Sequence, residues 1–157
     1  MPKKSRAGQA RRAVVAVSRY NQDVTRRLLD GALQTLVEGG WAPAAVDVVW
    51  VPGAFELPLA VDRALATGRY RLAVALGTVI RGETAHFEYV AGAATTGLEA
   101  AARMRGIPVG FGVLTCDTEE QALARAGGAA GHKGVEAALA ALEMRRVLDG
   151  LEDGASA

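Results

Sequence analysis

The sequence predicts an α/β fold with three layers, in which helices cover both faces of a four-stranded parallel sheet. The first observation behind this prediction is a set of four short, largely apolar runs, of which the first, residues 13–17, has the pattern of a strand buried on both faces. The second is that segments with apolar residues at helical spacing lie between these runs. Strands that alternate with helices pair in parallel through crossover connections, and 157 residues are enough for one such domain.

The first strand and the first helix come at the beginning of the chain. Residues 13–17 are an uninterrupted apolar run rich in valine, which predicts a buried strand. Asn21 is the predicted N-cap of the helix that follows, whose apolar residues recur over positions 24–37. The glycine pair at 39–40 is expected to end this helix.

The middle of the chain repeats this alternation twice. Residues 46–51 predict the second strand, which Pro52 breaks, and residues 55–66 carry apolar residues at helical spacing. The third apolar run covers residues 72–77, and the glycine at its end is expected to close the strand. A loop then leads into a long helix, predicted over residues 84–105, that is rich in alanine and glycine.

The last third of the chain supplies the fourth strand and two further helices. Residues 109–114 predict the strand, and Asp117 or Thr118 is expected to cap a short helix over residues 119–126. A final helix is predicted over residues 135–150, where a glycine is expected to end it.

Composition indicates a single domain over residues 1–157, with flexible tails at 1–12 and 151–157. The net charge of +1 gives no indication of a nucleic-acid partner. The first apolar run is too short for a signal peptide or a membrane span. One cysteine, Cys116, can form no disulfide within the chain and suits a reducing compartment. We therefore expect a cytoplasmic protein with no nucleic acid and no membrane among its partners.

The loops that follow the four strands are predicted to meet at one edge of the sheet, because parallel strands all end there. The loop after the third strand leads into a helix, where free N–H groups can hold a phosphate, and His86 lies beside it. Each of these features also has a simpler explanation. A single histidine can be solvated, Tyr20 can be an ordinary edge aromatic, and the charges around residues 125–136 can form a solvated face.

Several classes of site are excluded by motif. The sequence contains no Walker pattern, no GxGxxG, no metal-ligand spacing of histidines and carboxylates, and no nucleophile elbow. A phosphate cradle, a histidine, basic side chains and aromatic walls remain. This combination suits addition, elimination and condensation on a phosphorylated carbonyl compound.

Five ordered segments then carry a family resemblance across nearly the whole chain. They are Ser18–Asn21, Val51–Pro58, Gly77–Thr84 with His86, Phe111–Thr115 and Arg125–Glu136. Together they resemble the 6,7-dimethyl-8-ribityllumazine synthase family of riboflavin biosynthesis. The resemblance implies a flavodoxin-like arrangement of the sheet. It also implies condensation of 5-amino-6-(D-ribitylamino)uracil with 3,4-dihydroxy-2-butanone 4-phosphate, two small-molecule substrates, with release of phosphate and water and with no cofactor and no metal.

The resemblance also assigns roles to individual residues. It implies that His86 shuttles protons, and that the N–H groups of Glu83 and Thr84 hold the phosphate together with Arg125. The other substrate-binding positions that it implies are Tyr20 stacked on the pyrimidine ring with Asn21 beside it, Ala54, Phe55 and Glu56 on the ribityl chain, and the backbone of Thr78, Val79 and Ile80 at the ring edge.

In the family, the pocket is shared between neighbouring subunits of a pentamer. The resemblance therefore implies that Phe111, Arg125 and Lys133 reach the substrates of the adjacent subunit. A homopentamer with shared active sites is expected, with a decamer and an icosahedral 60-mer as larger alternatives. Three residues depart from the family pattern: Tyr20 stands where phenylalanine or tryptophan is common, His132 where asparagine is usual, and Cys116, expected to be buried, where a hydroxyl residue is usual.

Two alternatives belong to other functional classes. The first is a non-catalytic paralogue that forms a shell or binds flavin, and the presence of His86, Arg125 and Lys133 argues against it. The second is a flavodoxin-like electron carrier. The sequence after the first strand lacks the hydroxyl-rich phosphate loop that such a carrier needs.

Overall fold

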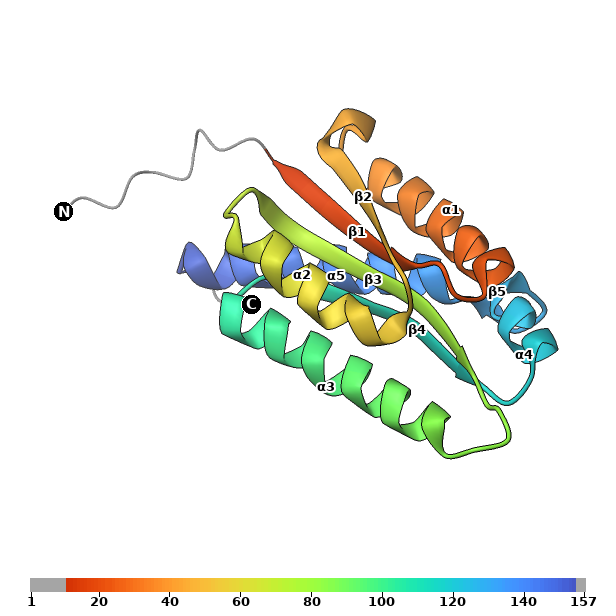
Figure 1. The fold of residues 1–157 in the computed structure, drawn as a ribbon. Helices are drawn as coiled ribbons and strands as arrows, with labels where there is room; N and C mark the ends of the chain where they lie inside the picture. The colour runs from red at the N-terminus through yellow and green to blue at the C-terminus, as the bar shows by residue number, and fades with distance from the viewer. Residues whose placement is uncertain (1–10, 155–157) are drawn as a thin grey trace.

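Four parallel strands form the central sheet of the computed structural model, which describes residues 11–154 (Figure 1). The strands are β1 (Arg12–Ser18), β2 (Val46–Val51), β3 (Tyr70–Ile80) and β4 (Val109–Cys116), in the order β2-β1-β3-β4. The register pairs Val15 of β1 with Val48 of β2 and Val74 of β3. All neighbouring strands are parallel, so they end at the same edge, and the predicted parallel α/β sheet is confirmed.

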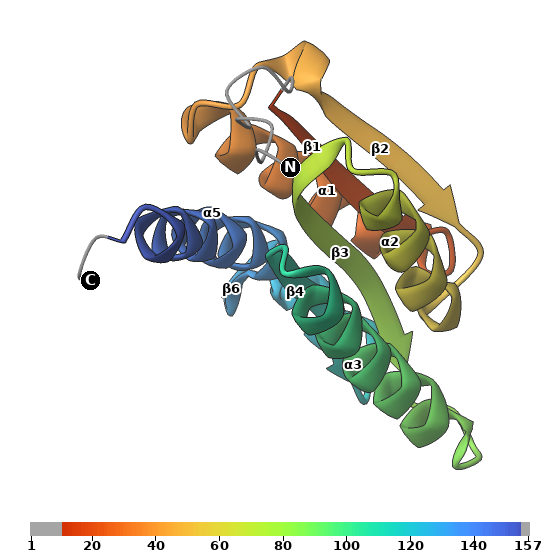
Figure 2. The same ribbon diagram turned by 90° about the vertical axis from the view of Figure 1, so that its left-hand side faces the viewer.

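Helices cover both faces of this sheet, as the sequence predicts (Figure 2). One face is covered by α1 (Gln22–Glu38), the short α4 (Glu119–Ala124) and α5 (Lys133–Glu152), and the other by α2 (Leu57–Ala66) and α3 (His86–Arg105). Single 3-10 turns, η2 (Pro43–Ala45) and η3 (Ala54–Glu56), precede β2 and α2. The prediction of a helix over 55–66 is therefore correct in place, with its first two residues in the 3-10 turn.

Side chains of β1 alternate between two hydrophobic cores. Ala13, Val15 and Val17 pack with α1 and α5, whereas Val14 and Ala16 pack with α2 and α3. All five are at most 1% exposed. A strand covered on both faces needs apolar residues at every position, which is why its sequence shows a continuous run instead of an alternating one.

β3 continues past Gly77, where the sequence predicted its end. Thr78, Val79 and Ile80 extend the ladder with the last residues of β4, so β4 also runs two residues longer than predicted. Gly77 is present for space: a Cβ there would lie 3.1 Å from Cδ1 of Leu57 and 3.2 Å from Oγ of Ser18. This glycine permits close packing within a strand and does not end it.

The last helix continues past Gly150, where the sequence predicted its end. α5 runs to Glu152, and the buried Arg145 holds this last turn. Its Nη2 lies 2.9 Å from Oδ1 of Asp149 and 3.4 Å from Oε1 of Glu152. These ion pairs stabilise a turn that the glycine weakens.

The predicted tails are shorter than expected where the structure describes them. Arg12 belongs to β1 and pairs with Asp47 of β2, and residues 151–152 belong to α5. The other predicted tail residues, 1–10 and 155–157, lie outside the described residues.

A small antiparallel hairpin between α4 and α5 is absent from the sequence prediction. It consists of β5 (Ala126–Gly128) and β6 (Gly131–His132), in which Ala126 pairs with His132. The predicted short helix stops at Ala124 for this reason, two residues early. Gly127 and Gly131 have φ angles of 100° and 99°, a backbone conformation that favours glycine.

Candidate active site

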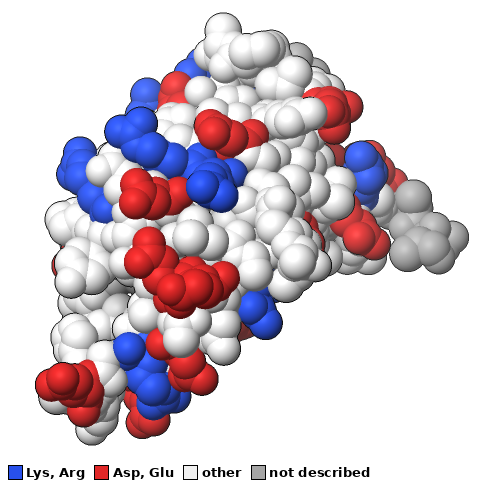
Figure 3. Space-filling model, turned by 90° about the vertical axis from the view of Figure 1, so that its right-hand side faces the viewer, with Lys and Arg blue, Asp and Glu red and all other residues white. Residues whose placement is uncertain are grey.

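Two cavities at the edge where the strands end are lined by all but one of the predicted site residues. Figure 3 shows this end of the molecule, where acidic and basic side chains surround uncharged surface. The first cavity has a volume of about 690 Å³ and contains ten of the predicted residues. They are Tyr20, Asn21, Ala54, Phe55, Glu56, Thr78, Val79, Ile80, Thr84 and His86.

Two exposed aromatic rings flank the first cavity. Tyr20, at the end of β1, is 74% exposed, and Phe55, in η3, is 61% exposed. The turn that carries Phe55 is held by Glu56, whose Oε2 accepts a hydrogen bond from the N–H of Gly53 at 3.0 Å. Rings that remain uncovered in the folded chain are available to stack on a planar ligand.

Asn21 ties the first loop to the floor of this cavity. It precedes α1 as predicted, but its side chain makes no cap hydrogen bond to the helix. Its Nδ2 donates instead to the carbonyl oxygen of Thr78 at 3.2 Å. A φ angle of 60° directs the side chain away from the helix start. Asn21 is therefore the N-cap residue of α1, as predicted, but its side chain joins the ends of β1 and β3 and does not cap the helix.

The start of α3 supplies the polar end of the first cavity. The helix begins at His86, two residues later than predicted, so the imidazole lies on the first helical residue. Thr84 lines the cavity just before it, and Thr84 Oγ1 lies 3.4 Å from the backbone nitrogen of His86. Glu83 is exposed and lines neither cavity. The positive end of the helix dipole and a titratable ring thus meet at one place.

Three further side chains line the first cavity although the sequence did not single them out. They are Phe87, Tyr89 and Val90, in the first turn of α3. Tyr89 and Val90 follow His86 by three and four positions, which is the spacing of one helix face. That spacing was the signal in the sequence that could have identified Tyr89 and Val90 as lining residues.

The second cavity has a volume of about 340 Å³ and contains the remaining predicted residues, Phe111, Arg125 and Lys133. The N–H of Lys133 donates to the carbonyl oxygen of Arg125 at 2.8 Å, so the backbones that carry the two cations are joined. Nη1 of Arg125 donates to the carbonyl oxygen of Gln121 at 3.0 Å. Lys133 Nζ lies 3.8 Å from Oε2 of Glu136, which also lines this cavity and ends the fifth of the segments that carry the family resemblance.

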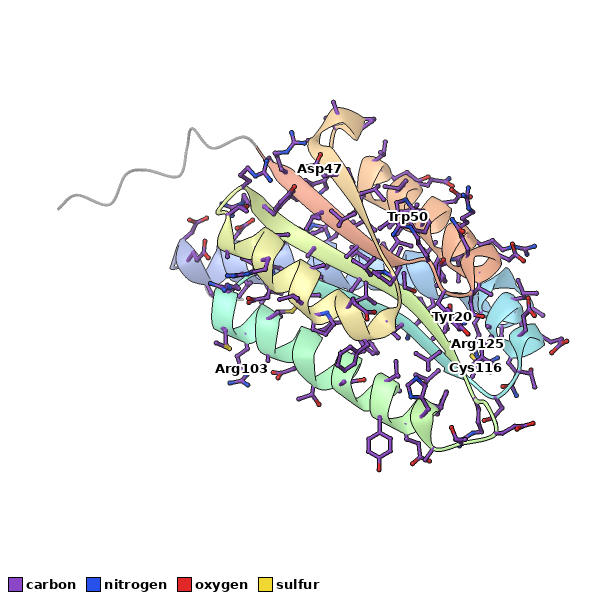
Figure 4. The ribbon with its side chains drawn as sticks, in the orientation of Figure 1. Tyr20, Asp47, Trp50, Arg103, Cys116 and Arg125 are labelled. Atoms are coloured by element: carbon purple, nitrogen blue, oxygen red, sulfur yellow. The ribbon has the colours of Figure 1, made fainter. Side chains whose placement is uncertain are left out.

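Cys116 lines the second cavity and is 5% exposed, so its predicted burial is confirmed. Burial raises the pKa of its thiol, and the nearby Arg125 opposes this shift in part. The sulfur is therefore held as a neutral thiol beside the cationic residues. Figure 4 shows Tyr20, Cys116 and Arg125 at the same end of the molecule, with Arg103 at the far end of α3.

The two cavities share no lining residue within one chain. His86 and the aromatic walls line the first, while Arg125 and Lys133 line the second. β3 and β4, paired from Ala73 and Val109 to Ile80 and Cys116, fix the position of one cavity relative to the other. One chain thus presents two separate halves of the residue set predicted from the sequence.

Two general features of the described part of the chain complete the description. Within residues 11–154, no helix is both long and apolar enough to cross a membrane. The same residues contain no group of three or more His, Cys, Asp and Glu side chains arranged to hold a metal ion.

Comparison with known proteins identifies the family. The family model of 6,7-dimethyl-8-ribityllumazine synthase matches residues 10–149. A curated protein named 6,7-dimethyl-8-ribityllumazine synthase, from Gemmatimonas aurantiaca, is 55% identical over 142 residues, which cover 90% of this chain and 87% of that relative. The matched region contains both cavities. The chain belongs to the 6,7-dimethyl-8-ribityllumazine synthase family.

Proposed function

We propose that the chain condenses 5-amino-6-(D-ribitylamino)uracil with 3,4-dihydroxy-2-butanone 4-phosphate to give 6,7-dimethyl-8-ribityllumazine, phosphate and water. This is the penultimate step of riboflavin biosynthesis. Family membership supports the reaction. The observation that carries it is the first cavity, where exposed aromatic rings lie across from a helix N-terminus with His86 on its first residue.

The first cavity suits both substrates. Tyr20 provides a ring face for the pyrimidine, and Phe55 and Glu56 border the space that the ribityl chain takes. The backbone at the end of β3 offers hydrogen bonds to the edge of the pyrimidine. At the other end, the N–H groups that precede and begin α3 receive the phosphate of the second substrate. Holding the two substrates together supplies a large part of the rate acceleration.

His86 moves the protons in this scheme. The amino group of the pyrimidine attacks the ketone carbon, and His86 gives a proton to the oxygen that leaves as water. The imidazole then takes a proton from the carbon between the imine carbon and the phosphate-bearing carbon, and the C–O bond to phosphate breaks with its electron pair on phosphate. The enol that remains becomes a ketone, and the ribitylamino nitrogen attacks its carbonyl carbon and closes the second ring with loss of a second water. An imidazole can act as acid in one step and base in the next because its ordinary pKa lies near neutrality.

The active site is shared between two copies of the chain in our proposal. Arg125 holds the departing phosphate, Phe111 contacts the pyrimidine, and Lys133 adds a second positive charge, all from the neighbouring subunit. The separation of the two cavities within one chain supports this arrangement, because each contains residues that the reaction needs. A ring in which the second cavity of each copy meets the first cavity of the next gives complete sites.

We further propose that this ring is a homopentamer in the cytoplasm. The exposed rings at the first cavity, including Tyr89 at 77%, support burial against another copy. The buried, unpaired Cys116 supports a reducing compartment. Multi-angle light scattering of the purified protein distinguishes the pentamer from a decamer and from a 60-subunit shell.

The reaction is tested directly by mixing the purified protein with both substrates and EDTA. We expect the fluorescent lumazine to form with one phosphate released for each product. A well-assembled protein that gives no product would contradict the proposal and favour a non-catalytic paralogue. Tight binding of flavin mononucleotide with reversible reduction would instead indicate an electron carrier.

A further inference from the structure

His132 caps the helix that carries Lys133 into the second cavity. α5 starts at Lys133, and Nδ1 of His132 accepts a hydrogen bond from the N–H of Val135 at 3.3 Å. The N–H groups of a first helical turn have no partner within the helix, so this acceptor fixes how α5 leaves the preceding hairpin.

Gly31 of α1 provides the space for this imidazole. A Cβ at Gly31 would lie 2.2 Å from Cε1 and 2.4 Å from Nε2 of His132, much closer than two atoms can approach without a bond. Gly31 is buried in the interior of α1, where alanine would stabilise the helix more than glycine does. The chain therefore has a helix-weakening residue at the point where the ring is seated.

The first turn of α5 is held against α1 by a second glycine. A Cβ at Gly134 would lie 2.1 Å from the carbonyl oxygen of Leu28, so the two backbones are in direct contact there. The contact with Leu28 and the seat at Gly31 lie one turn apart on α1. Together they fix the start of α5 relative to the sheet.

His132 also lies between the two cations of the second cavity. In the hairpin it pairs with Ala126, the residue that follows Arg125 in the chain. His132 is itself followed by Lys133. The backbone hydrogen bond from Lys133 to Arg125 closes this arrangement. His132 itself is not among the residues that line the cavity. Its side chain lies against Gly31 of α1 and the first turn of α5, outside the cavity.

We propose that His132, seated on Gly31, is the positioning residue of the second cavity. Its cap sets the start of α5 and thereby the distance between the guanidinium of Arg125 and the ammonium of Lys133. This inference rests on the function proposed above, in which those two groups meet the phosphorylated substrate.

Two substitutions at position 132 distinguish the effect of the hydrogen-bond acceptor from the effect of the rest of the imidazole ring. Oδ1 of asparagine is as many bonds from Cα as Nδ1 of histidine, so His132→Asn keeps an acceptor while His132→Ala removes it. We expect His132→Ala to raise KM for the phosphorylated substrate about fivefold, the size of effect that a lost helix cap has on an equilibrium, with a smaller change in kcat. His132→Asn is expected to restore KM to within about twofold of the wild-type value.

Substitution of Gly31 tests the seat independently. Gly31→Ala forces the ring of His132 away and is expected to raise KM as His132→Ala does. Asparagine has no counterpart of Cε1 and Nε2, the two ring atoms of His132 that lie closest to a Cβ at residue 31. In the His132→Asn background, only the distance of 2.9 Å between that Cβ and the position of Nδ1 remains short. Gly31→Ala is therefore expected to have a much smaller effect there. This variant keeps the test available even where His132→Ala does not fold.

Gly39→Ala is the matched control. Gly39 lies at the other end of the same helix pair, where a Cβ would lie 2.6 Å from Cδ1 of Leu142. We expect this substitution to lower Tm with no change in KM for the phosphorylated substrate. The proposal would be overturned if His132→Ala had the wild-type KM for the phosphorylated substrate. It would also be overturned if Gly31→Ala raised this KM equally in the wild-type protein and in His132→Asn.

Hydrogen exchange distinguishes this proposal from the proposed reaction. In the substrate-free oligomer, the amide of Val135 is expected to exchange faster in His132→Ala than in the wild type, and at the wild-type rate in His132→Asn. Unchanged exchange in all three proteins would contradict the cap. A protein that shows the expected exchange but forms no lumazine would contradict the proposed reaction and leave the cap in place.

Discussion

Nε of Arg81 donates to Oδ1 of Asp117 at 2.8 Å, which joins the loop after β3 to the loop after β4. The same guanidinium lies 3.7 Å, by its Nη1, from Oε1 of Glu88, and its Cζ is 4.7 Å from the ring centre of Phe87. One side chain thus contacts the first turn of α3 and the start of the segment that leads to Arg125. It holds the loop over residues 82–85, on which the first cavity depends.

Loss of Arg81 is expected to reduce catalysis more than stability. The pair with Asp117 is exposed, and such pairs contribute little to folding because water and salt screen them. Arg81→Ala should therefore leave Tm nearly unchanged, while a looser loop lowers kcat/KM roughly fivefold. Arg103→Ala is the control, because Arg103 makes a similar exposed pair with Glu99 far from both cavities. Equal kinetic effects of the two substitutions would contradict the assignment.

Loss of His86 is expected to slow the reaction without loss of assembly. The imidazole is exposed and contributes little to either hydrophobic core. A general acid and base of this type contributes about 10² to 10⁴ in rate, so His86→Ala should lower kcat by roughly a hundredfold or more. Steady-state kinetics and light scattering of the same sample provide the measurement. A kcat within twofold of the wild type would exclude the proton-transfer role.

Loss of Arg125 is expected to act mainly on the phosphorylated substrate. Hydrogen bonds to a charged group contribute about 1.5–3 kcal/mol, so Arg125→Ala should raise KM for that substrate by roughly ten- to a hundredfold. KM for the pyrimidine substrate should change much less. Arg125→Lys keeps the charge but not the planar fork, and we expect it to restore part of the loss. An unchanged KM for the phosphorylated substrate would contradict the phosphate-binding role.

Mixed oligomers test whether the site is shared. At concentrations of the phosphorylated substrate far below the raised KM of Arg125→Ala, both His86→Ala and Arg125→Ala should be nearly inactive, because each removes one half of every site. The two variants are unfolded together and reassembled in equal amounts, so that neighbours in the ring are random. At about one site in four, one chain then supplies an intact His86 and its neighbour supplies an intact Arg125. Activity should therefore return to about a quarter of the wild-type value, as judged by lumazine fluorescence. Sites formed within single chains would give no such recovery.

The thiol of Cys116 is expected to resist alkylation in the folded protein. Its pKa is raised by burial, and the thiolate is the reactive form, so the rate should increase only above the pH range in which an ordinary cysteine ionises. Iodoacetamide labelling followed by mass spectrometry, with and without urea, measures this difference. Equal rates for the folded and unfolded protein at neutral pH would contradict the burial of the sulfur.

The parts of the fold that follow from local pattern were predicted from the sequence. Residues 13–17 read as a strand because two-sided burial requires apolar residues at every position. Residues 46–51 were also predicted as a strand, although β2 lies at the edge of the sheet and is only partly buried. Both predictions are confirmed. Two of the predictions that failed concern glycines. Gly77 and Gly150 were expected to end their elements, yet one provides space within a strand and the other lies in a turn held by ion pairs. Those causes are tertiary contacts.

The site was predictable as a set of residues but not as an arrangement. Asn21 has the residue type of an N-cap, and its true partner, Thr78, lies 57 positions away in the chain. The separation of His86 from Arg125 into two cavities depends on how β3 and β4 pair, which no local motif encodes. His132 looked like a neutral exchange for asparagine, and its seat on Gly31 appears once α1 and α5 are packed.

The separate cavities have a genetic consequence under the shared-site arrangement that we propose. Each copy lends its first cavity to one neighbour and its second cavity to the other, so a copy that assembles with both cavities defective disables two sites in the ring. An allele of that kind expressed beside a normal one should therefore reduce activity by more than its share of the protein. A copy with only one defective cavity disables one site, so two alleles that are defective in different cavities should partly complement each other.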